Sequence, residues 1–132
     1  MLAWSKDYDT GSPLVDTQHR MLIEKINELG LLMSGPPPSK AAVDELVEFL
    51  GAYVNYHFKF EERCMDHYRC PVREQNKRAH EAFLAFFNGF KERYLIEGPK
   101  PELLLGLQKT ASDWIKDHIL TVDIQLNTCL KT

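Results

Sequence analysis

The sequence lacks the features that mark a membrane protein or a nucleic-acid-binding protein. None of its apolar runs approaches the roughly 20 residues that a bilayer-spanning helix requires. Its net charge of −3 provides no basic surface for nucleic acid or for an anionic membrane. No basic segment followed by an apolar one stands at the N-terminus, so no signal peptide is visible. These absences predict a soluble protein with neither nucleic acid nor membrane as a partner.

Cysteine is scarce as well. Three cysteines are an odd number and too few for a disulfide framework, which favours a reducing cytoplasm. The run Cys64-x-x-His67-x-x-Cys70 could be a metal cluster or a redox thiol pair, but two thiols and one imidazole fall short of a closed zinc site. We therefore expect buried or idle cysteines and an exposed His67 near a helix end. The sequence does not indicate a partner for Cys129.

What the sequence does contain is four segments with apolar residues at steps of three and four, the period of an α-helix, and no β-pattern between them. A chain of 132 residues fits one domain. Short breakers rich in proline and glycine separate the segments. The pattern predicts an all-α fold, an antiparallel up-down four-helix bundle with an N-terminal arm. Residues 1–132 are expected to form this single domain, which could also be part of a longer protein.

Caps and breakers predict where the helices begin and end. Asp16 is an acceptable N-cap for the first helix, which Gly35 and three prolines end. Ser39 can cap the second helix. Trp4 and Tyr8 are apolar anchors for an arm packed on the bundle. The other expected limits are about Tyr68 for the end of the second helix, Pro71 in the first turn of the third, and 103–118 for the fourth, with a tail of uncertain structure at 119–132.

The second helix carries an imidazole and a carboxylate on its inward face. His57 and Glu61 are four residues apart, so they lie one above the other on the apolar stripe. A buried carboxylate is costly unless it is paired, hydrogen-bonded or bound to a metal. The other inward polar residues are His19, Asn76, His80 and His118. Four of the five histidines thus fall on apolar stripes, one per helix, which is more than separate core histidines would explain.

This set of side chains indicates a metal centre. Imidazoles with a few carboxylates suit iron, zinc, copper or nickel. Two carboxylates among four histidines exceed the ligands of a structural zinc site, and a pair of metals bridged by Glu61 and Asp123 uses the set more naturally. Asp123 follows His118 by five residues, which leaves it roughly 140° away on an ideal helix. It can join the site only if the helix end bends or its side chain reaches across.

Four motifs and a following acid resemble those of bacterial hemerythrins, in the same order along the chain. They are Val15-Asp16-Thr17-Gln18-His19, His57-Phe58-Lys59-Phe60-Glu61-Glu62, His80-Glu81-Ala82-Phe83, and Trp114-Ile115-Lys116-Asp117-His118 followed by Asp123. The resemblance extends from Trp4 to Asp123 and implies a non-haem centre of two Fe ions, bridged by oxo or hydroxo, that binds O2 reversibly and accepts small anions.

The resemblance also implies a role for each candidate ligand. His19 and His57 would bind one iron, and the other would be bound by a second pair of histidines. Two carboxylates would bridge the metals. The second histidine pair is His80 and His118, and the bridging carboxylates are Glu61 and Asp123.

One position departs from the family. Its His-x-x-x-His motif reads Asn76-Lys77-Arg78-Ala79-His80 here, and an asparagine oxygen is a weak ligand for iron. The second iron should therefore have a position for water, for the amide or for an added anion. We expect ready oxidation, so that diferrous/diferric conversion makes the domain an O2 or redox sensor. In the family such domains occur alone or fused to signalling outputs such as a diguanylate cyclase. The resemblance therefore implies that residues 1–132 could be the N-terminal sensory domain of a longer signalling protein, with a fused or separate output domain as a candidate partner.

Two other functions stay open. The chain could be an O2 storage or carrier protein, or, less favoured, a diiron oxidase or peroxidase; no further acid or base lies on the inward stripes. The domain by itself is expected to be a binding module and not an enzyme. The residues expected to wall an O2 pocket, besides packing in the core, are Leu22, Phe58, Trp114 and Ile115.

Overall fold

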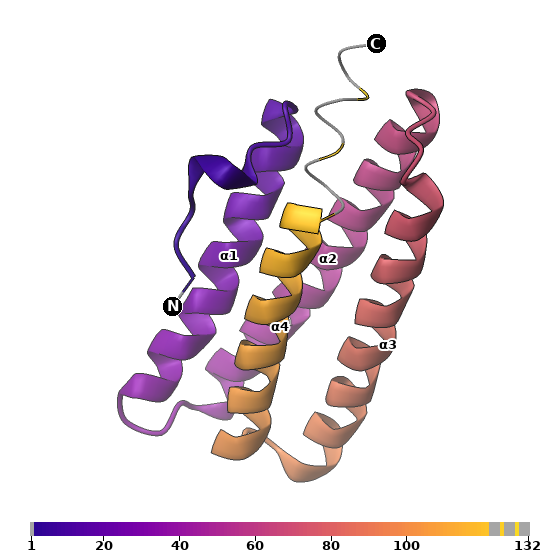
Figure 1. Cartoon of the computed structure of the whole chain (residues 1–132). Helices are drawn as coiled ribbons and strands as arrows, with labels where there is room; N and C mark the ends of the chain where they lie inside the picture. Colours follow the sequence, from indigo (N-terminus) through magenta and orange to yellow (C-terminus); the bar gives the residue numbers. More distant parts are fainter. Residues whose placement is uncertain (1, 122–124, 126–128, 130–132) are drawn as a thin grey trace.

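The computed structural model describes residues 2–121, 125 and 129. Successive long helices run in opposite directions (Figure 1), and no β-strand occurs among the described residues. The all-α, up-down four-helix bundle predicted from the sequence is confirmed. Its elements are a short 3-10 helix η1 (Lys6–Tyr8) and the α-helices α1 (Pro13–Ser34), α2 (Lys40–His67), α3 (Arg73–Glu97) and α4 (Pro101–Thr121).

The first helix begins earlier than predicted. The Ser12 hydroxyl accepts a hydrogen bond from the Val15 backbone N–H, and Pro13 occupies the first turn, where its missing N–H is not needed. Asp16 was therefore wrongly assigned as the N-cap. It lies inside the first turn and accepts hydrogen bonds from the backbone N–H and the hydroxyl of Thr10, at 2.9 and 2.8 Å, which ties the arm to α1.

The other helix limits lie close to expectation. Ser39 caps α2 as predicted, accepting a hydrogen bond from Ala42 N–H at 3.1 Å. Pro71, expected in the first turn of the third helix, lies in the turn before it, and α3 begins at Arg73. Gly98 ends α3 with a φ of 75°, a left-handed conformation that glycine adopts without strain.

The helices form a closed ring in which each packs against the next and α4 packs back against α1. Their apolar stripes meet in one core. The N-terminal arm lies along the bundle as predicted, with Tyr8 buried and the Trp4 ring 5.4 Å from it. No helix in the described part of the chain is both long enough and apolar enough to cross a membrane.

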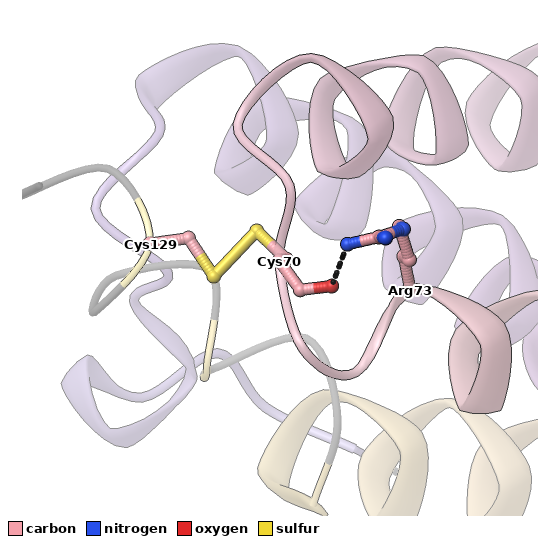
Figure 2. The surroundings of a disulfide bond; sticks show 3 residues. All are labelled: Cys70, Arg73 and Cys129. Carbon is pink, nitrogen blue, oxygen red and sulfur yellow. Dashed lines mark hydrogen bonds between the residues drawn. A yellow bond between two sulfur atoms is a disulfide. The ribbon is translucent and has the colours of Figure 1, made fainter.

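A disulfide bond joins Cys70, in the α2–α3 connection, to Cys129 (Figure 2). The Arg73 guanidinium donates a hydrogen bond to the Cys70 carbonyl beside it, at 3.1 Å. The sequence did not indicate this partner for Cys129, and the expectation of idle cysteines was wrong for Cys70 and Cys129. Cys64 is the free thiol of the described residues. Since 59 residues separate the two bonded cysteines, only the folded chain reveals the pair.

Candidate metal centre

Two pairs of imidazoles face the two carboxylate oxygens of Glu61. On one side, Oε2 lies 3.3 Å from His19 Nε2 and 3.6 Å from His57 Nε2. On the other, Oε1 lies 3.2 Å from His80 Nε2 and 3.9 Å from His118 Nε2. Each pair with Glu61 forms a cluster that could hold one metal ion. The carboxylate therefore lies between two candidate metal positions and belongs to both.

The antiparallel arrangement brings these residues to one end of the bundle. His19 lies in the second turn of α1, and Glu61 lies near the end of α2. His80 is in the second turn of α3, whereas His118 is in the last turn of α4. Because alternate helices reverse direction, the beginnings of α1 and α3 meet the ends of α2 and α4. Residues 99 positions apart in sequence (118 − 19) consequently share one site.

The site is buried, and a cation would stabilise its carboxylate. His19, His57 and Glu61 are fully buried, and His80 and His118 are 1% and 4% exposed. None of the described residues donates a hydrogen bond to either Glu61 oxygen, and His57 Nε2 likewise has no hydrogen-bond partner among them. An ionised carboxylate in such a place is costly unless cations compensate for the lost water. The donor set and its polar atoms without hydrogen bonds fit metal cations bound between the imidazoles and Glu61.

Two residues outside the candidate ligand set orient the imidazoles. The Nδ1 of His57 is hydrogen-bonded to Gln18 Oε1 at 2.6 Å, and the Nδ1 of His80 to Glu62 Oε2 at 2.8 Å. Each bond directs the opposite nitrogen, Nε2, toward Glu61, as outer partners do in metal sites. Neither residue was identified from the sequence. Gln18 did carry a signal, since it lies on the buried face of α1 four residues before Leu22.

Burial lowers the pKa of His57 to about 3, because the charged imidazolium would lose its hydration; the negative charge of Glu61 opposes this effect, and the neighbouring imidazoles reinforce it. His57 is therefore neutral at ordinary pH. A neutral imidazole has a lone pair available for a metal, so the burial that disfavours protonation also favours coordination.

Asn76 is the residue at the position where the family's His-x-x-x-His motif has its first histidine. It is fully buried, and its Oδ1 accepts a hydrogen bond from His118 Nε2 at 2.8 Å. The amide nitrogen Nδ2 has no hydrogen-bond partner among the described residues. The asparagine thus lies in the site and contacts one of the candidate ligands.

The remaining candidate residues fall outside the cluster. Asp123 lies outside the described residues, so its role as a bridging carboxylate stays a prediction. His67 is exposed at the end of α2, as expected. The alternative cluster of Cys64, His67 and Cys70 does not form, because the Cys70 sulfur is bonded to Cys129.

The four residues expected to wall an O2 pocket all border one apolar cavity. The Phe58 ring stacks on His80, with 3.9 Å between ring centroids, and Trp114 stacks on His118 at 4.5 Å. The cavity has a volume of about 20 Å³, enough for one very small molecule. Its lining side chains belong to Leu22, Ile26, Leu50, Val54, Phe58, Phe83, Phe87, Leu107, Ala111, Trp114 and Ile115.

Comparison with known proteins agrees with this four-helix bundle and its buried imidazole and carboxylate groups. Residues 10–127 match the family model "Hemerythrin HHE cation binding domain". The chain belongs to this hemerythrin family of cation-binding domains.

Individual relatives and a solved structure give the same result. The chain is 31% identical over 122 residues to a bacteriohemerythrin of Pseudomonas aeruginosa, covering 92% of this chain and 76% of that protein. A bacteriohemerythrin of Stenotrophomonas maltophilia is 29% identical over 119 residues, with 90% and 74% covered. A crystal structure of wild-type hemerythrin superposes with a TM-score of 0.85 over 100% of this chain and 99% of that chain, at 20% identity, which shows the shared fold.

Proposed function

We propose that this chain binds two iron ions, one on each side of Glu61, and uses them to bind O2 and to sense oxidation. The observation that carries the proposal is the division of the Glu61 carboxylate. One oxygen faces the imidazole pair of α1 and α2, and the other faces the pair of α3 and α4. A single structural metal would not need a carboxylate shared in this way, whereas a bridged pair does.

The proposed ligands are the residues of the two clusters around Glu61. His19 and His57 would hold one iron, His80 and His118 the other, and Glu61 would bridge them. By resemblance to the family, Asp123 and an oxo or hydroxo group would complete the bridge. When bound, the two irons would supply the two electrons that reversible O2 binding requires.

The surrounding residues would orient the imidazoles and exclude water from the site. Gln18 and Glu62 hold the imidazoles in the orientation that presents Nε2 to the site. Phe58 and Trp114 cover two imidazoles with apolar rings and exclude water from that side. The apolar cavity beside them suits a small uncharged molecule such as O2, because its walls expose no polar atom to hold water.

Sensing is favoured over storage by Asn76. With an amide in place of an imidazole, the second metal position has fewer strong ligands and would accept water or a small anion. Easy exchange and oxidation suit a sensor that signals to a fused or separate output domain, whereas a carrier must avoid oxidation. An oxidase or peroxidase activity is less favoured, because Glu62 is hydrogen-bonded to His80 Nδ1 on the side of the ring away from Glu61 and does not face the two candidate metal positions.

Two measurements test the proposal. After loading with excess Fe²⁺, metal analysis with an optical spectrum should give two irons per chain and the charge-transfer bands of an oxo-bridged pair. One metal per chain at this excess, or zinc alone, would contradict the proposal. Stopped-flow mixing of the reduced protein with O2 should then give rapid oxidation, slowed in Asn76→His. Repeated binding and release of O2 without oxidation, equal in both proteins, would support the carrier function instead.

A further inference from the structure

The two halves of the site differ in which imidazole nitrogen an amide oxygen holds. Gln18 accepts a hydrogen bond from His57 at Nδ1, the nitrogen that points away from Glu61. Asn76 is hydrogen-bonded to His118 at Nε2, the nitrogen that faces Glu61. The same chemical group therefore acts in opposite ways. On the first side it leaves the inward nitrogen available for a metal, and on the second side it occupies that nitrogen.

An imidazole nitrogen that donates a hydrogen bond carries a proton, so it has no lone pair for a cation. Before His118 Nε2 can bind a metal, its bond to Asn76 must break and its proton must leave that nitrogen. Breaking the bond also leaves the buried Asn76 oxygen without this donor, which is unfavourable.

We infer that the two metal positions bind cations with unequal affinity, because Asn76 competes with the second cation for His118. The inference rests on the proposed function and adds an order of filling to it. The His19, His57 and Glu61 side fills first. The His80, His118 and Glu61 side fills only when the cation displaces the amide. At low metal concentration the protein holds a single cation, and Asn76 sets the concentration at which the second one enters.

The second position could be weak because Asn76 competes for His118 or because it has too few ligands. One substitution distinguishes these two causes. Asn76→Leu keeps the size of the side chain, adds no ligand and removes the amide oxygen that holds His118. If competition weakens the second position, this variant should bind the second cation more tightly than the natural protein does. If the second position is weak only because an imidazole is missing, the leucine should not strengthen it.

The test is titration of the metal-free full chain with Co²⁺, followed by calorimetry and visible absorption. The natural protein should show two steps, and Asn76→Leu should raise the second affinity by roughly two- to tenfold, because one competing hydrogen bond contributes about that much. Asn55→Leu, on the exposed face of α2, is the matched control and should change neither step. Asn76→Ala removes the same hydrogen bond and replaces the leucine variant if that variant does not fold.

The outcomes distinguish this inference from the proposed function. Two equal affinities in the natural protein would overturn the inference and leave the two-metal function intact. Two steps that the leucine and alanine variants leave unchanged, or weaken, would also overturn it, because the amide would then not compete. If the protein binds no Co²⁺ at all, both the inference and the proposed function would be overturned.

Discussion

Gln18 and His57 are joined by a buried hydrogen bond of 2.6 Å across 39 residues of sequence. This bond connects α1 to α2 directly beside the candidate metal centre and fixes the plane of the His57 ring. The orientation of the His57 ring, and with it metal binding at His57, should therefore depend on Gln18.

Replacing Gln18 with leucine should weaken cation binding at the His19 and His57 position by roughly tenfold to a hundredfold, as loss of an outer partner commonly does. The reason is that the His57 ring loses the contact that directs Nε2 toward Glu61. Co²⁺ titration measures the affinity. Gln108→Leu, on α4 away from the site, is the control. An unchanged first affinity would show that packing alone orients the ring.

Metal removal should destabilise the folded protein strongly. Without a cation, the buried Glu61 carboxylate lacks hydrogen-bond donors among the described residues. At free metal about a thousandfold above the dissociation constant, binding contributes about 4 kcal/mol. For a domain of this size, that corresponds to roughly 10–20 °C in melting temperature. Calorimetry before and after chelation measures the difference, and superimposable melting curves would contradict a metal bound in the buried site.

The metal-free protein should lose stability in acid because of His57. Burial lowers the pKa of this residue from 6.5 to about 3. Between these values the unfolded chain takes up a proton that the folded chain does not. The free energy of unfolding therefore decreases as the pH falls from about 6.5 toward 3, by at most about 1.4 kcal/mol per pH unit for one proton.

Urea unfolding of the metal-free protein at several pH values tests this expectation. The slope of the free energy of unfolding against pH gives the number of protons taken up on unfolding. This number should be smaller by about one in His57→Gln and unchanged in His67→Gln, since His67 is exposed. Equal slopes in the natural protein and His57→Gln would mean that His57 is protonated in the folded state as readily as in the unfolded one.

The Cys70–Cys129 disulfide should stabilise the oxidised protein. It closes a loop of 59 residues, for which chain entropy predicts about 4 kcal/mol. Urea unfolding with and without a reductant measures the difference in a Cys64→Ala background, where no third thiol can exchange. Cys129→Ala should remove the effect of the reductant.

A thiol assay then checks the pairing itself. One reactive thiol is expected in the unfolded, oxidised natural protein, and three would rule out the disulfide.

The expectation of a cytoplasmic location rested partly on unpaired cysteines, and it stays a prediction without that support.

Filling the apolar cavity should slow the entry of O2. Ala111 lines the cavity beside Trp114 and Ile115, so Ala111→Val would occupy part of its volume. The O2 association rate of the reduced, iron-loaded protein should fall, while the final iron content stays the same. Ala52→Val, at an exposed position on α2, is the control. An unchanged rate would place the route of O2 elsewhere.

Local sequence patterns were sufficient to predict which side chains of the site point inward. His57 and Glu61 are one helical turn apart, so their common inward direction follows from the period of the helix. The same reasoning directs His19, His80 and His118 inward, and the structure gathers them around Glu61. Their role as iron ligands remains a prediction, and that of Asp123 does as well.

Contacts between helices were not predictable in the same way. The oxygens of Gln18 and Asn76 each lie within hydrogen-bonding distance of one histidine nitrogen, across 39 and 42 residues. Such contacts depend on the rotation and height of two helices relative to each other, which the pattern of one helix does not specify. The start of α1 was misplaced for a local reason, since Ser12 and Asp16 are both good caps and the arm's contact with Asp16 decides between them.

The sequence by itself determined the four amphipathic helices, their breakers, and the inward direction of four imidazoles and one carboxylate, because these follow from a period of 3.6 residues and from the local chemistry of caps and prolines. Only the tertiary structure decided which nitrogen of each imidazole faces Glu61. It also decided that Asn76 is bonded to His118 and that Cys70 meets Cys129. These contacts join distant parts of the chain, and they form only when packing of the whole core sets the helices against one another.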